Sequence, residues 1–514
     1  MKKASAEKGL LCTRIIPGLA ILAAITTFSG GACHAGTGPG VDGTTVNPSG
    51  DSVEVILTGV DVYTGLSADP STADPPSYGY PVLEEETYFE EGGQEWVSRM
   101  YITRDMEAIR DALANGGMIT LNPGVYNWNA RTVYSQIMGG GEVFQYTSMM
   151  QYDRDYLAWV TALDYHLKGA GKGPGDPSVK VVCDFFIHIG ADPDWATTGT
   201  MPTQVIENVH FDNSEWLEYN YAQGVFDNYN TLLGWHSQAD ITVKGCKFTG
   251  GGVTFHNWGK VTFAENVMEN TFYGVDVTYP ACTSFIVTRN KITTVSGEGI
   301  WCQYNVSSWW GMEPATIEIV GNEVEWAGLA GIGVWYTDGM VSIHHNKVTS
   351  SPGIFPNSFG YYAGIGCWDC MKGALLMGNE VTGNSDLPNV YALNLGGTSD
   401  SIVQSNKVSG PWMVPVTLDW YETPANSNVL IGNNLNDADA ISGFHYMFDY
   451  TDYNVVRGGG VAGHNIVVLD NGLVAGSNLF TGLDHRIGQL TLEEPYTSMK
   501  EAMKDKFPKP GDSQ

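Results

Sequence analysis

Basic residues are scarce in this chain, and charged residues of any kind are few. Lys and Arg number 26 against 56 Asp and Glu, which gives a formal net charge of −30, and charged residues make up 16% of the 514 residues. Binding to a phosphate backbone needs a basic surface, so a nucleic acid is not expected as a partner. An acidic surface instead suits a neutral or cationic ligand, or simple solubility outside the cell.

Long apolar runs are absent after the N-terminal region. Lys2, Lys3 and Arg14 surround the start of the apolar stretch IIPGLAILAAITTF, and small residues follow it in SGGACHAG. This pattern predicts an export signal over residues 1–35, cleaved after Ala35, and no transmembrane segment in the rest of the chain. Cys33 offers the alternative of a lipid anchor. The mature protein is therefore expected to be secreted, periplasmic or attached to the cell surface.

Cysteine patterns typical of zinc sites or disulfide frameworks are also lacking. Six of the eight cysteines follow residue 35, and only Cys367 and Cys370 form a CxxC, without a second pair or a thioredoxin-like setting. In one extended strand these two side chains would point to opposite faces, too far apart to bond. We therefore predict a buried Cys367 and no bond between the pair.

Glycine is abundant, at 63 residues, and its distribution suggests strands and turns in a repeating order. Residues 36–100 are rich in Gly, Pro, Ser and acidic residues, as in a spacer. Met106, Ile109 and Leu113 then share one face of a predicted short helix, which is followed by a strand at Met118–Leu121. Residues 491–514 are predicted to form a short helical cap and a polar tail.

One phrase recurs along the chain, an asparagine two places before an apolar residue. The spacings between its copies are 24, 32, 24, 33, 27 and 27 residues, so each repeat joins fixed strands by variable loops. In stacked coils such asparagines can hydrogen-bond to one another from turn to turn. We predict a structural ladder, without a catalytic role, of Asn266, Asn290, Asn322, Asn346, Asn379, Asn406 and Asn433.

The N-terminal part of the repeat region resembles a known architecture. The predicted helix, then GGMITLNPGVY, then LKGAGKG at 167–173 resemble the opening of right-handed parallel β-helix (pectin lyase-like) proteins, which include pectate lyases, polygalacturonases and alginate lyases. The resemblance implies an all-β, right-handed parallel β-helix of about nine to eleven coils over residues 101–490, with a short N-terminal capping helix. The catalytic motifs of these enzyme families are not found, so no specific enzyme family is matched and no catalytic residue is carried over.

A second phrase occurs twice, as AGIGVWYTDG at 330–339 and AGIGCWDCMKG at 363–373. Aligned with period two, it predicts that Val334, Cys367 and Leu393 occupy successive turns of one wall. The residue after each inward side chain must point outward, and successive turns lie about 4.8 Å apart. The predicted outward row is His256, Thr278, Gln303, Trp335, Trp368, Asn394 and Asp419. Gly333 and Gly366 are expected to leave a depression beside the two tryptophans.

This outward face combines aromatic rings with carboxylates and amides, which suits a sugar polymer. The predicted substrate-binding residues are Trp335, Trp368, Trp301, Tyr336, Gln303, Asn394 and Trp420. The alternative is that these aromatic side chains only pack beneath the variable loops.

Catalysis on this face would need a pair of carboxylates or a base. The candidates are Asp369, Asp419, Asp338 and His256, and calcium held by Asp276 would supply the cation that a lyase needs. Two functions stay open at this point. The chain is either an exported polysaccharide lyase or glycoside hydrolase, or a non-enzymatic cell-surface β-helix protein with a structural or glycan-binding role.

Overall fold

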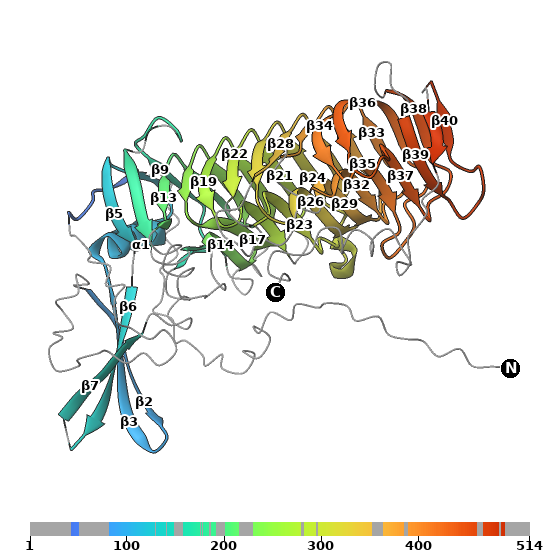
Figure 1. The fold of residues 1–514 in the computed structure, drawn as a ribbon. Helices are drawn as coiled ribbons and strands as arrows, with labels where there is room; N and C mark the ends of the chain where they lie inside the picture. Colours follow the sequence, from blue (N-terminus) through green and yellow to red (C-terminus); the bar gives the residue numbers. More distant parts are fainter. Residues whose placement is uncertain are drawn as a thin grey trace. The chain divides into compact units, whose positions relative to one another are not determined.

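Most of the chain forms a coil of parallel β-strands in the computed structural model (Figure 1). The structure describes residues 43–50, 82–128, 130–139, 141–148, 158–174, 176, 178–183, 187–191, 201–214, 230–278, 282–294, 297–351, 363–384, 389–459, 466–482 and 485–488. The predicted export signal, Cys33 and the predicted cap at 491–514 lie outside these residues. Among the residues described, no helix is long and apolar enough to cross a bilayer.

A regular turn of the coil contributes one strand to each of three walls, and these strands pair in parallel with their counterparts in the neighbouring turns. The first wall consists of β1 (Thr44–Val46), β4 (Gly117–Leu121), β9 (Tyr165–Gly169), β12 (Thr203–Glu207), β15 (Asp240–Lys244), β18 (Lys260–Ala264), β21 (Ser284–Thr288), β24 (Thr316–Val320), β27 (Met340–His344), β30 (Ala374–Met377), β33 (Ile402–Gln404), β36 (Val429–Ala440), β38 (Val455–Gly459) and β40 (Leu479–Thr481).

The second wall shares β36 with the first wall, so the two form one 24-stranded sheet. Its other strands are β5 (Gly124–Trp128), β10 (Val179–Cys183), β13 (His210–Asp212), β16 (Lys247–Thr249), β19 (Val267–Thr271), β22 (Lys291–Thr294), β25 (Glu323–Trp326), β28 (Lys347–Ser350), β31 (Glu380–Thr382) and β34 (Lys407–Trp412).

The third wall is a separate 13-stranded sheet, with more strands than the nine to eleven turns predicted, because turns without the asparagine phrase add strands at its ends. It consists of β8 (Ala158–Val160), β11 (Ile187–Gly190), β14 (Asn230–Ser237), β17 (Gly252–Asn257), β20 (Val275–Thr278), β23 (Ile300–Gln303), β26 (Ala330–Thr337), β29 (Ala363–Cys370), β32 (Tyr391–Gly396), β35 (Val414–Asp419), β37 (Tyr446–Asp449), β39 (Ile466–Asn471) and β41 (His485–Gly488).

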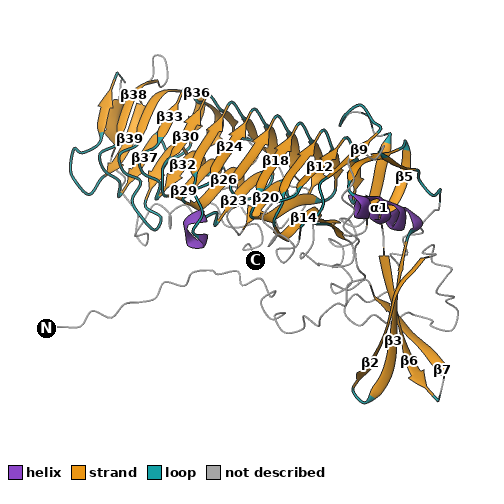
Figure 2. Cartoon of the chain, turned by 180° about the vertical axis from the view of Figure 1, so that it is seen from behind, coloured by secondary structure: helices purple, strands orange, loops and turns teal. Residues whose placement is uncertain are grey.

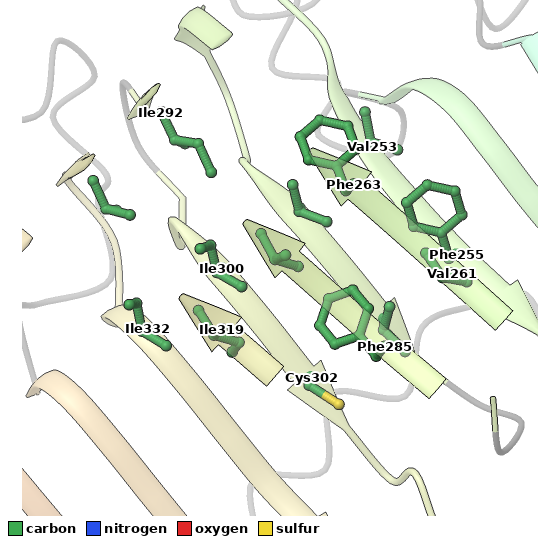
Figure 3. Close-up of a cluster of buried hydrophobic side chains, with 14 of the residues drawn as sticks. Val253, Phe255, Val261, Phe263, Phe285, Ile292, Ile300, Cys302, Ile319 and Ile332 are labelled. Atoms are coloured by element: carbon green, nitrogen blue, oxygen red, sulfur yellow. The ribbon is translucent and has the colours of Figure 1, made fainter. Parts of the chain in front are cut away.

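The apolar core fills the space between the walls. Alternate residues of each strand point inward, and Figure 3 shows Phe255 and Cys302 of the third wall facing Phe263 and Phe285 of the first wall. All four side chains are fully buried. Because side chains alternate along a strand, the residues between them, such as Trp301, lie on the outer surface.

Helix α1 (Arg104–Asn115) packs against the first turn of the coil, through contacts with β1, β4 and β5 (Figure 2). The Thr103 side chain accepts a hydrogen bond from the Met106 backbone N–H and so caps the helix. Met106, Ile109 and Leu113 are buried, as the predicted helical face requires. The helix thus covers core residues at this end that would otherwise be exposed to water.

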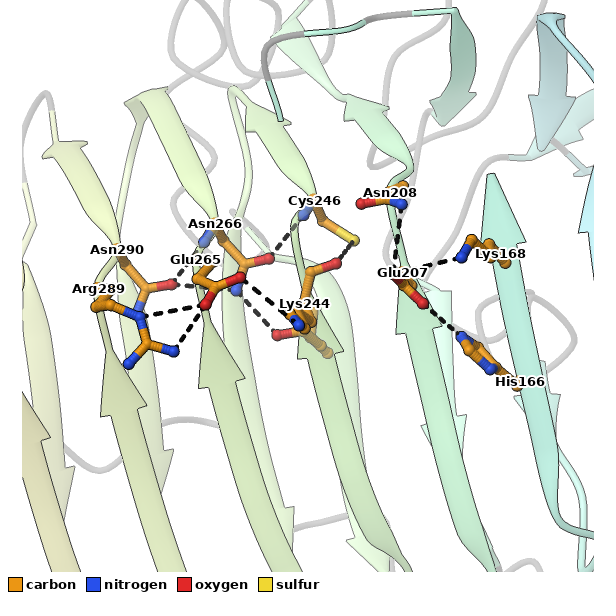
Figure 4. A network of polar contacts seen from close by, with 11 residues as sticks. His166, Lys168, Glu207, Asn208, Lys244, Cys246, Glu265, Asn266, Arg289 and Asn290 are labelled. Atoms are coloured by element: carbon orange, nitrogen blue, oxygen red, sulfur yellow. Dashed lines mark hydrogen bonds and ion pairs between the residues drawn. The ribbon is translucent and has the colours of Figure 1, made fainter. Parts of the chain in front are cut away.

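The recurring asparagines lie at the corner between the first and second walls and bond to one another along the coil (Figure 4). The Asn290 Oδ1 atom accepts hydrogen bonds from the backbone N and the Nδ2 of Asn266, at 2.8 and 3.1 Å. The same paired bonds join each later member to the next, up to Asn433. The ladder satisfies backbone and amide groups where the chain bends, since buried polar groups need such partners.

A second asparagine ladder, which the sequence reading missed, lies where the chain enters the first wall. The Asn454 Oδ1 accepts from the backbone N–H of Asn428, and the Asn478 Oδ1 accepts from that of Asn454. This second ladder covers fewer turns than the first. One turn earlier the corresponding residue is Ser401, whose backbone N–H donates to Asn428 Oδ1. With only these few copies, the phrase did not stand out from the sequence.

Four further strands form an antiparallel sheet, β2 (Val82–Glu91), β3 (Gln94–Ile102), β6 (Ala130–Met138) and β7 (Gly141–Ser148), paired in that order. Two of these strands, together with β1, belong to the segment 36–100 that we read as a spacer. The described parts of that segment are therefore largely β-strand. The Gly, Pro and acidic residues of the segment obscured these strands, and the partner of β1 is β4, which is distant in sequence.

Candidate functional site

Outward side chains of the third wall form two parallel rows. The upstream row is Thr254, Asp276, Trp301, Gly333, Gly366, Asn394 and Thr417. The downstream row, two residues further along each strand, is Thr278, Gln303, Trp335, Trp368, Gly396, Asp419 and Asp449. Each row places residues from strands that are distant in sequence next to one another.

The predicted alignment is wrong by two residues at β32. Cys367 pairs with Leu395 rather than with Leu393, and Asn394 pairs with Gly366 rather than with Trp368. Asn394 therefore lies in the upstream row, beside Thr417, and Gly396 stands between Trp368 and Asp419. The apolar residues of β32 recur with the same period of two in both alignments, so the pattern alone did not fix the register.

A third set of residues, the corner row, follows the downstream row directly. Tyr304, Tyr336, Asp369, Gly397 and Tyr450 all have left-handed backbone conformations, with φ between 48° and 65°. The residue after each of them points back into the core, and these residues (Asn305, Thr337, Cys370, Thr398 and Thr451) are all buried. The repeated conformation is thus a feature of the coil's corner, which turns the chain out of the third wall.

This corner also corrects the prediction for the two cysteines. Cys367 points inward from β29, and Cys370 would point outward if the strand continued unbroken. Because Asp369 adopts a left-handed conformation, Cys370 turns inward as well, and both thiols lie in the core. The pair therefore lies on one side of the wall, not on two.

The glycines of the upstream row leave no depression, contrary to expectation. The Trp301 ring lies over Gly333, and the Trp368 ring lies over Gly366, so that a Cβ atom at either glycine would overlap a ring. The two indole rings are 5.8 Å apart at their centroids, and Trp368 is 5% exposed. These rings form a packed apolar floor rather than an open pocket.

Further aromatic rings stand around this floor and remain accessible to solvent. The Trp335 ring lies 4.8 Å from Tyr304 and meets Tyr421 edge-on at 6.2 Å. Tyr304 also lies 5.9 Å from Tyr336. Trp420 and Tyr421 are 50% and 41% exposed, so this end of the cluster has aromatic side chains in contact with water.

Two predicted carboxylates converge over one strand. Gly396 and Gly397 end β32 and begin its corner. A Cβ atom at Gly397 would overlap Asp369 Oδ1, and one at Gly396 would lie 3.1 Å from Asp419 Oδ1. The Asp419 carboxylate also accepts a hydrogen bond from Asn394 Nδ2 at 3.0 Å. The structure thus brings together three of the predicted residues, Asp369, Asp419 and Asn394.

The environment of Asp369 favours its neutral form. Burial raises the pKa of Asp369, and the nearby carboxylate of Glu422 raises it further, while a hydrogen bond from the Thr423 hydroxyl acts in the opposite direction. Burial likewise raises the pKa of Tyr421, which lies close to Asp369, Glu422 and Asp419. A carboxylic acid beside a second carboxylate is the arrangement that acid–base chemistry uses.

Several polar atoms at this place are buried without a partner. Asp369 Oδ2, Asn394 Oδ1, Thr417 Oγ1 and Trp335 Nε1 make no hydrogen bond to any residue that the structure describes. Asn394 and Thr417 are fully buried, and Asp369 is 5% exposed. Each such group costs stability unless a buried water satisfies it. Because the atoms of Asn394 and Thr417 are closed to solvent, they lie beneath the site and a ligand on the surface does not reach them.

Other predicted residues have local structural roles or lie elsewhere. Both oxygens of Asp338 accept backbone N–H groups, from Ser307 at 2.9 Å and Ser308 at 2.8 Å, at the start of a short 3₁₀ helix at Ser307–Trp310. His256 is buried, and its ring centroid is 6.4 Å from that of Trp258. Both residues are therefore held by their own surroundings and do not join the carboxylates over β32.

Asp276 lies in the upstream row beside Trp301, and its two oxygens accept from the Thr278 hydroxyl at 2.8 and 3.0 Å. Burial raises the pKa of Asp276 to about 7. A carboxyl group that keeps its proton to near-neutral pH is a poor calcium ligand. Within the described ranges, no group of three His, Cys, Asp or Glu side chains is arranged to hold a metal ion, so the calcium prediction gains no support.

The sequence reading missed Tyr421, Glu422 and Thr423. They follow β35, the strand after which the chain leaves the wall instead of turning back into the core, so Tyr421 is exposed where Thr398 of the previous turn is buried. The run DWYET at 419–423 was the available signal, because it places aromatic and acidic residues together directly after a predicted strand.

One comparison with known proteins bears on the fold. A family model described as a right handed beta helix region matches residues 203–348, so the predicted right-handed parallel β-helix is confirmed. No curated protein sequence shows significant similarity. Among solved structures, the A-module of the mannuronan C-5 epimerase AlgE6 from Azotobacter vinelandii matches with a TM-score of 0.43 and 13% identity, covering 76% of this chain and 97% of that module.

Proposed function

We propose that the protein binds an extracellular polysaccharide on the third wall, between β23 and β35. The observation that carries the proposal is the exposed pair Trp420 and Tyr421, packed against Trp335 and standing beside carboxylates. Sugar hydroxyl groups both donate and accept hydrogen bonds, and sugar C–H faces stack on aromatic rings. The predicted export signal would bring the protein to such a ligand.

A sugar fits this surface better than a nucleic acid or an acidic polymer does. The site contains Asp369, Asp419 and Glu422, and strands β23, β26, β29, β32 and β35 contain neither Lys nor Arg. Negative charge on a ligand would therefore be repelled without compensation. A neutral or weakly cationic glycan is the expected ligand.

A second candidate function is cleavage of that glycan by hydrolysis. Asp369, whose pKa is raised, would donate a proton to the glycosidic oxygen, and Asp419 would serve as the second carboxylate. The convergence of the two carboxylates over Gly396 and Gly397 supports this candidate. A lyase reaction is less well supported, because it needs a cationic group to neutralise a uronate, and the five strands of the site offer none.

The test combines binding with product analysis on a panel of neutral, cationic and anionic polysaccharides. Binding is measured by affinity electrophoresis, hydrolysis by the release of reducing ends, and lyase activity by absorbance from unsaturated ends. We expect binding to a neutral or cationic glycan that is lost in Trp335→Ala, and reducing ends that disappear in Asp369→Asn while binding persists.

The outcomes separate the alternatives. Binding without any product would leave a glycan-binding surface protein as the function. Failure of every glycan to bind would overturn the proposal itself, and unsaturated products would replace hydrolysis by a lyase reaction. Asp437→Asn, at an exposed position on β36, is the matched control for the carboxylate substitution.

A further inference from the structure

The thiols of Cys367 and Cys370 lie together in the core at the end of β29. Cys367 is fully buried and Cys370 is 2% exposed. The Cys370 Sγ atom lies 3.7 Å from the Val334 carbonyl oxygen and 3.9 Å from that of Trp368. The left-handed conformation of Asp369, with a φ of 48°, folds the chain between the two cysteines so that both thiols face the same way.

The two thiols also contact each other. A hydrogen bond between the Cys370 and Cys367 thiols, together with burial, raises the pKa of Cys367 well above its usual value. Cys302 is a further thiol of the core, and besides burial the Cys282 and Cys370 thiols raise its pKa. Cys302 and Cys367 are separated by one intervening strand, because both pair with Val334 of β26. Cys282 accepts a hydrogen bond from Asn305 Nδ2 at 3.2 Å.

We propose that Cys367 and Cys370 form a disulfide bond across the Asp369 corner when the chain folds in an oxidising compartment. Two thiols of the chain exchange with a small-molecule or protein disulfide, which accepts two electrons and two protons and leaves as two thiols. One S–S bond forms in the chain, and one breaks in the oxidant. This inference does not depend on the proposed sugar-binding function.

Burial determines when the bond can form. The thiolate is the species that attacks a disulfide, and the raised pKa of Cys367 keeps this thiol protonated in the folded protein. Oxidants also have no access to two buried sulfur atoms. The bond therefore forms before the coil closes over the pair, and afterwards it resists reductants as long as the protein stays folded. The disulfide bond therefore crosslinks the corner that carries Asp369 permanently and is not a reversible redox switch.

Tryptic digestion places the two cysteines in one peptide, so the mass of that peptide tests for the disulfide bond. Trypsin cleaves after Lys347 and Lys372, and the peptide between them contains Cys367 and Cys370 and no other cysteine. The full chain is exported to a bacterial periplasm, and in parallel it is refolded from the reduced, denatured state in a glutathione redox buffer. Free thiols are then alkylated in denaturant before digestion, with and without prior reduction.

The expected unreduced peptide carries no alkyl group and has a mass two hydrogen atoms below that of the dithiol form. After reduction in denaturant it carries two alkyl groups, and reductant applied to the folded protein leaves it unchanged. Alkylation of both cysteines before reduction in both preparations, or a bond from either cysteine to Cys302, would overturn the proposal.

Two variants extend the test. Cys246→Ser removes a buried thiol at another corner and should leave the bond in the peptide intact. Cys370→Ser should abolish the difference in Tm between oxidised and reduced protein, a difference of a few degrees in the wild type because the closed loop is short. If Cys370→Ser does not fold, the wild-type peptide mass still decides the question. Equal Tm values for oxidised and reduced wild-type protein would contradict a stabilising disulfide bond.

Discussion

Asp369 and Asp419 belong to strands that do not pair with each other, yet their carboxylates approach two consecutive residues of the strand between them, Gly397 and Gly396. The arrangement depends on those two glycines having no side chain. A Cβ atom at Gly397 would occupy the position of an Asp369 oxygen. The intervening strand therefore acts as a spacer that keeps the two acids facing one surface.

Gly397→Ala should destabilise the protein more than Gly432→Ala does. Both glycines have left-handed conformations, with φ values of 65° and 59°, but nothing lies within 4 Å of a Cβ atom at Gly432. We expect about 1 kcal/mol of destabilisation at Gly432 from backbone strain alone, and about 2–3 kcal/mol at Gly397, where Asp369 must also move. The free energy of unfolding in urea measures both. Equal losses would show that Asp369 does not lie against Gly397.

Asn379→Ala should break the first asparagine ladder in its middle. Asn346 would lose the acceptor of its backbone N–H and of its side-chain amide, at 2.9 and 3.0 Å. Leaving these buried groups unpaired should cost about 1–3 kcal/mol per group. Asn436→Ala, at an exposed position on β36, should change the urea midpoint very little. A similar urea midpoint for both variants would mean that water replaces the missing side-chain amide of Asn379.

Asp276→Asn should stabilise the protein at alkaline pH and leave it unchanged at acidic pH. Burial raises the pKa of Asp276 in the folded state to about 7, against a usual value near 4 in an unfolded chain. Between these values the folded state binds a proton that the unfolded state does not, so stability falls as the pH rises towards 7. The Tm of the variant should exceed that of the wild type at pH 8 and match it at pH 4.

Asp437→Asn serves as the control for that experiment, because Asp437 is exposed on β36. Its Tm should follow the wild type across the whole pH range. A gain in Tm for Asp276→Asn that is as large at pH 4 as at pH 8 would show that the effect is not titration of the Asp276 carboxyl group.

Trp420→Ala should weaken glycan binding by about tenfold, because one exposed ring in contact with a ligand contributes on the order of 1–2 kcal/mol. Tyr453→Ala is the matched control, since Tyr453 is 58% exposed but lies at the corner of the second asparagine ladder. Affinity electrophoresis in gels containing the bound glycan compares the two variants. Equal retardation of both would place the ligand away from the third wall.

Much of the site could be predicted from the sequence one strand at a time. The phrase with Trp335 and Trp368 was aligned correctly, and those residues are register partners. The register was wrong at β32, where alternating apolar residues are compatible with two alignments that differ by two positions. Tyr421 was missed because periodicity describes strands, whereas Tyr421 lies in a loop that leaves the regular corner.

The sequence by itself determined the architecture of this protein, because a coil of parallel strands repeats the same local demands in every turn. Inward apolar residues alternate along each strand, and an asparagine occupies the same corner, so the pattern is visible in the chain. Only the tertiary structure decided which carboxylates meet, that Trp301 and Trp368 fill the space over the glycines, and that Cys370 turns towards Cys367. These features depend on backbone conformation at single corners and on contacts between turns, and neither leaves a periodic trace in the sequence.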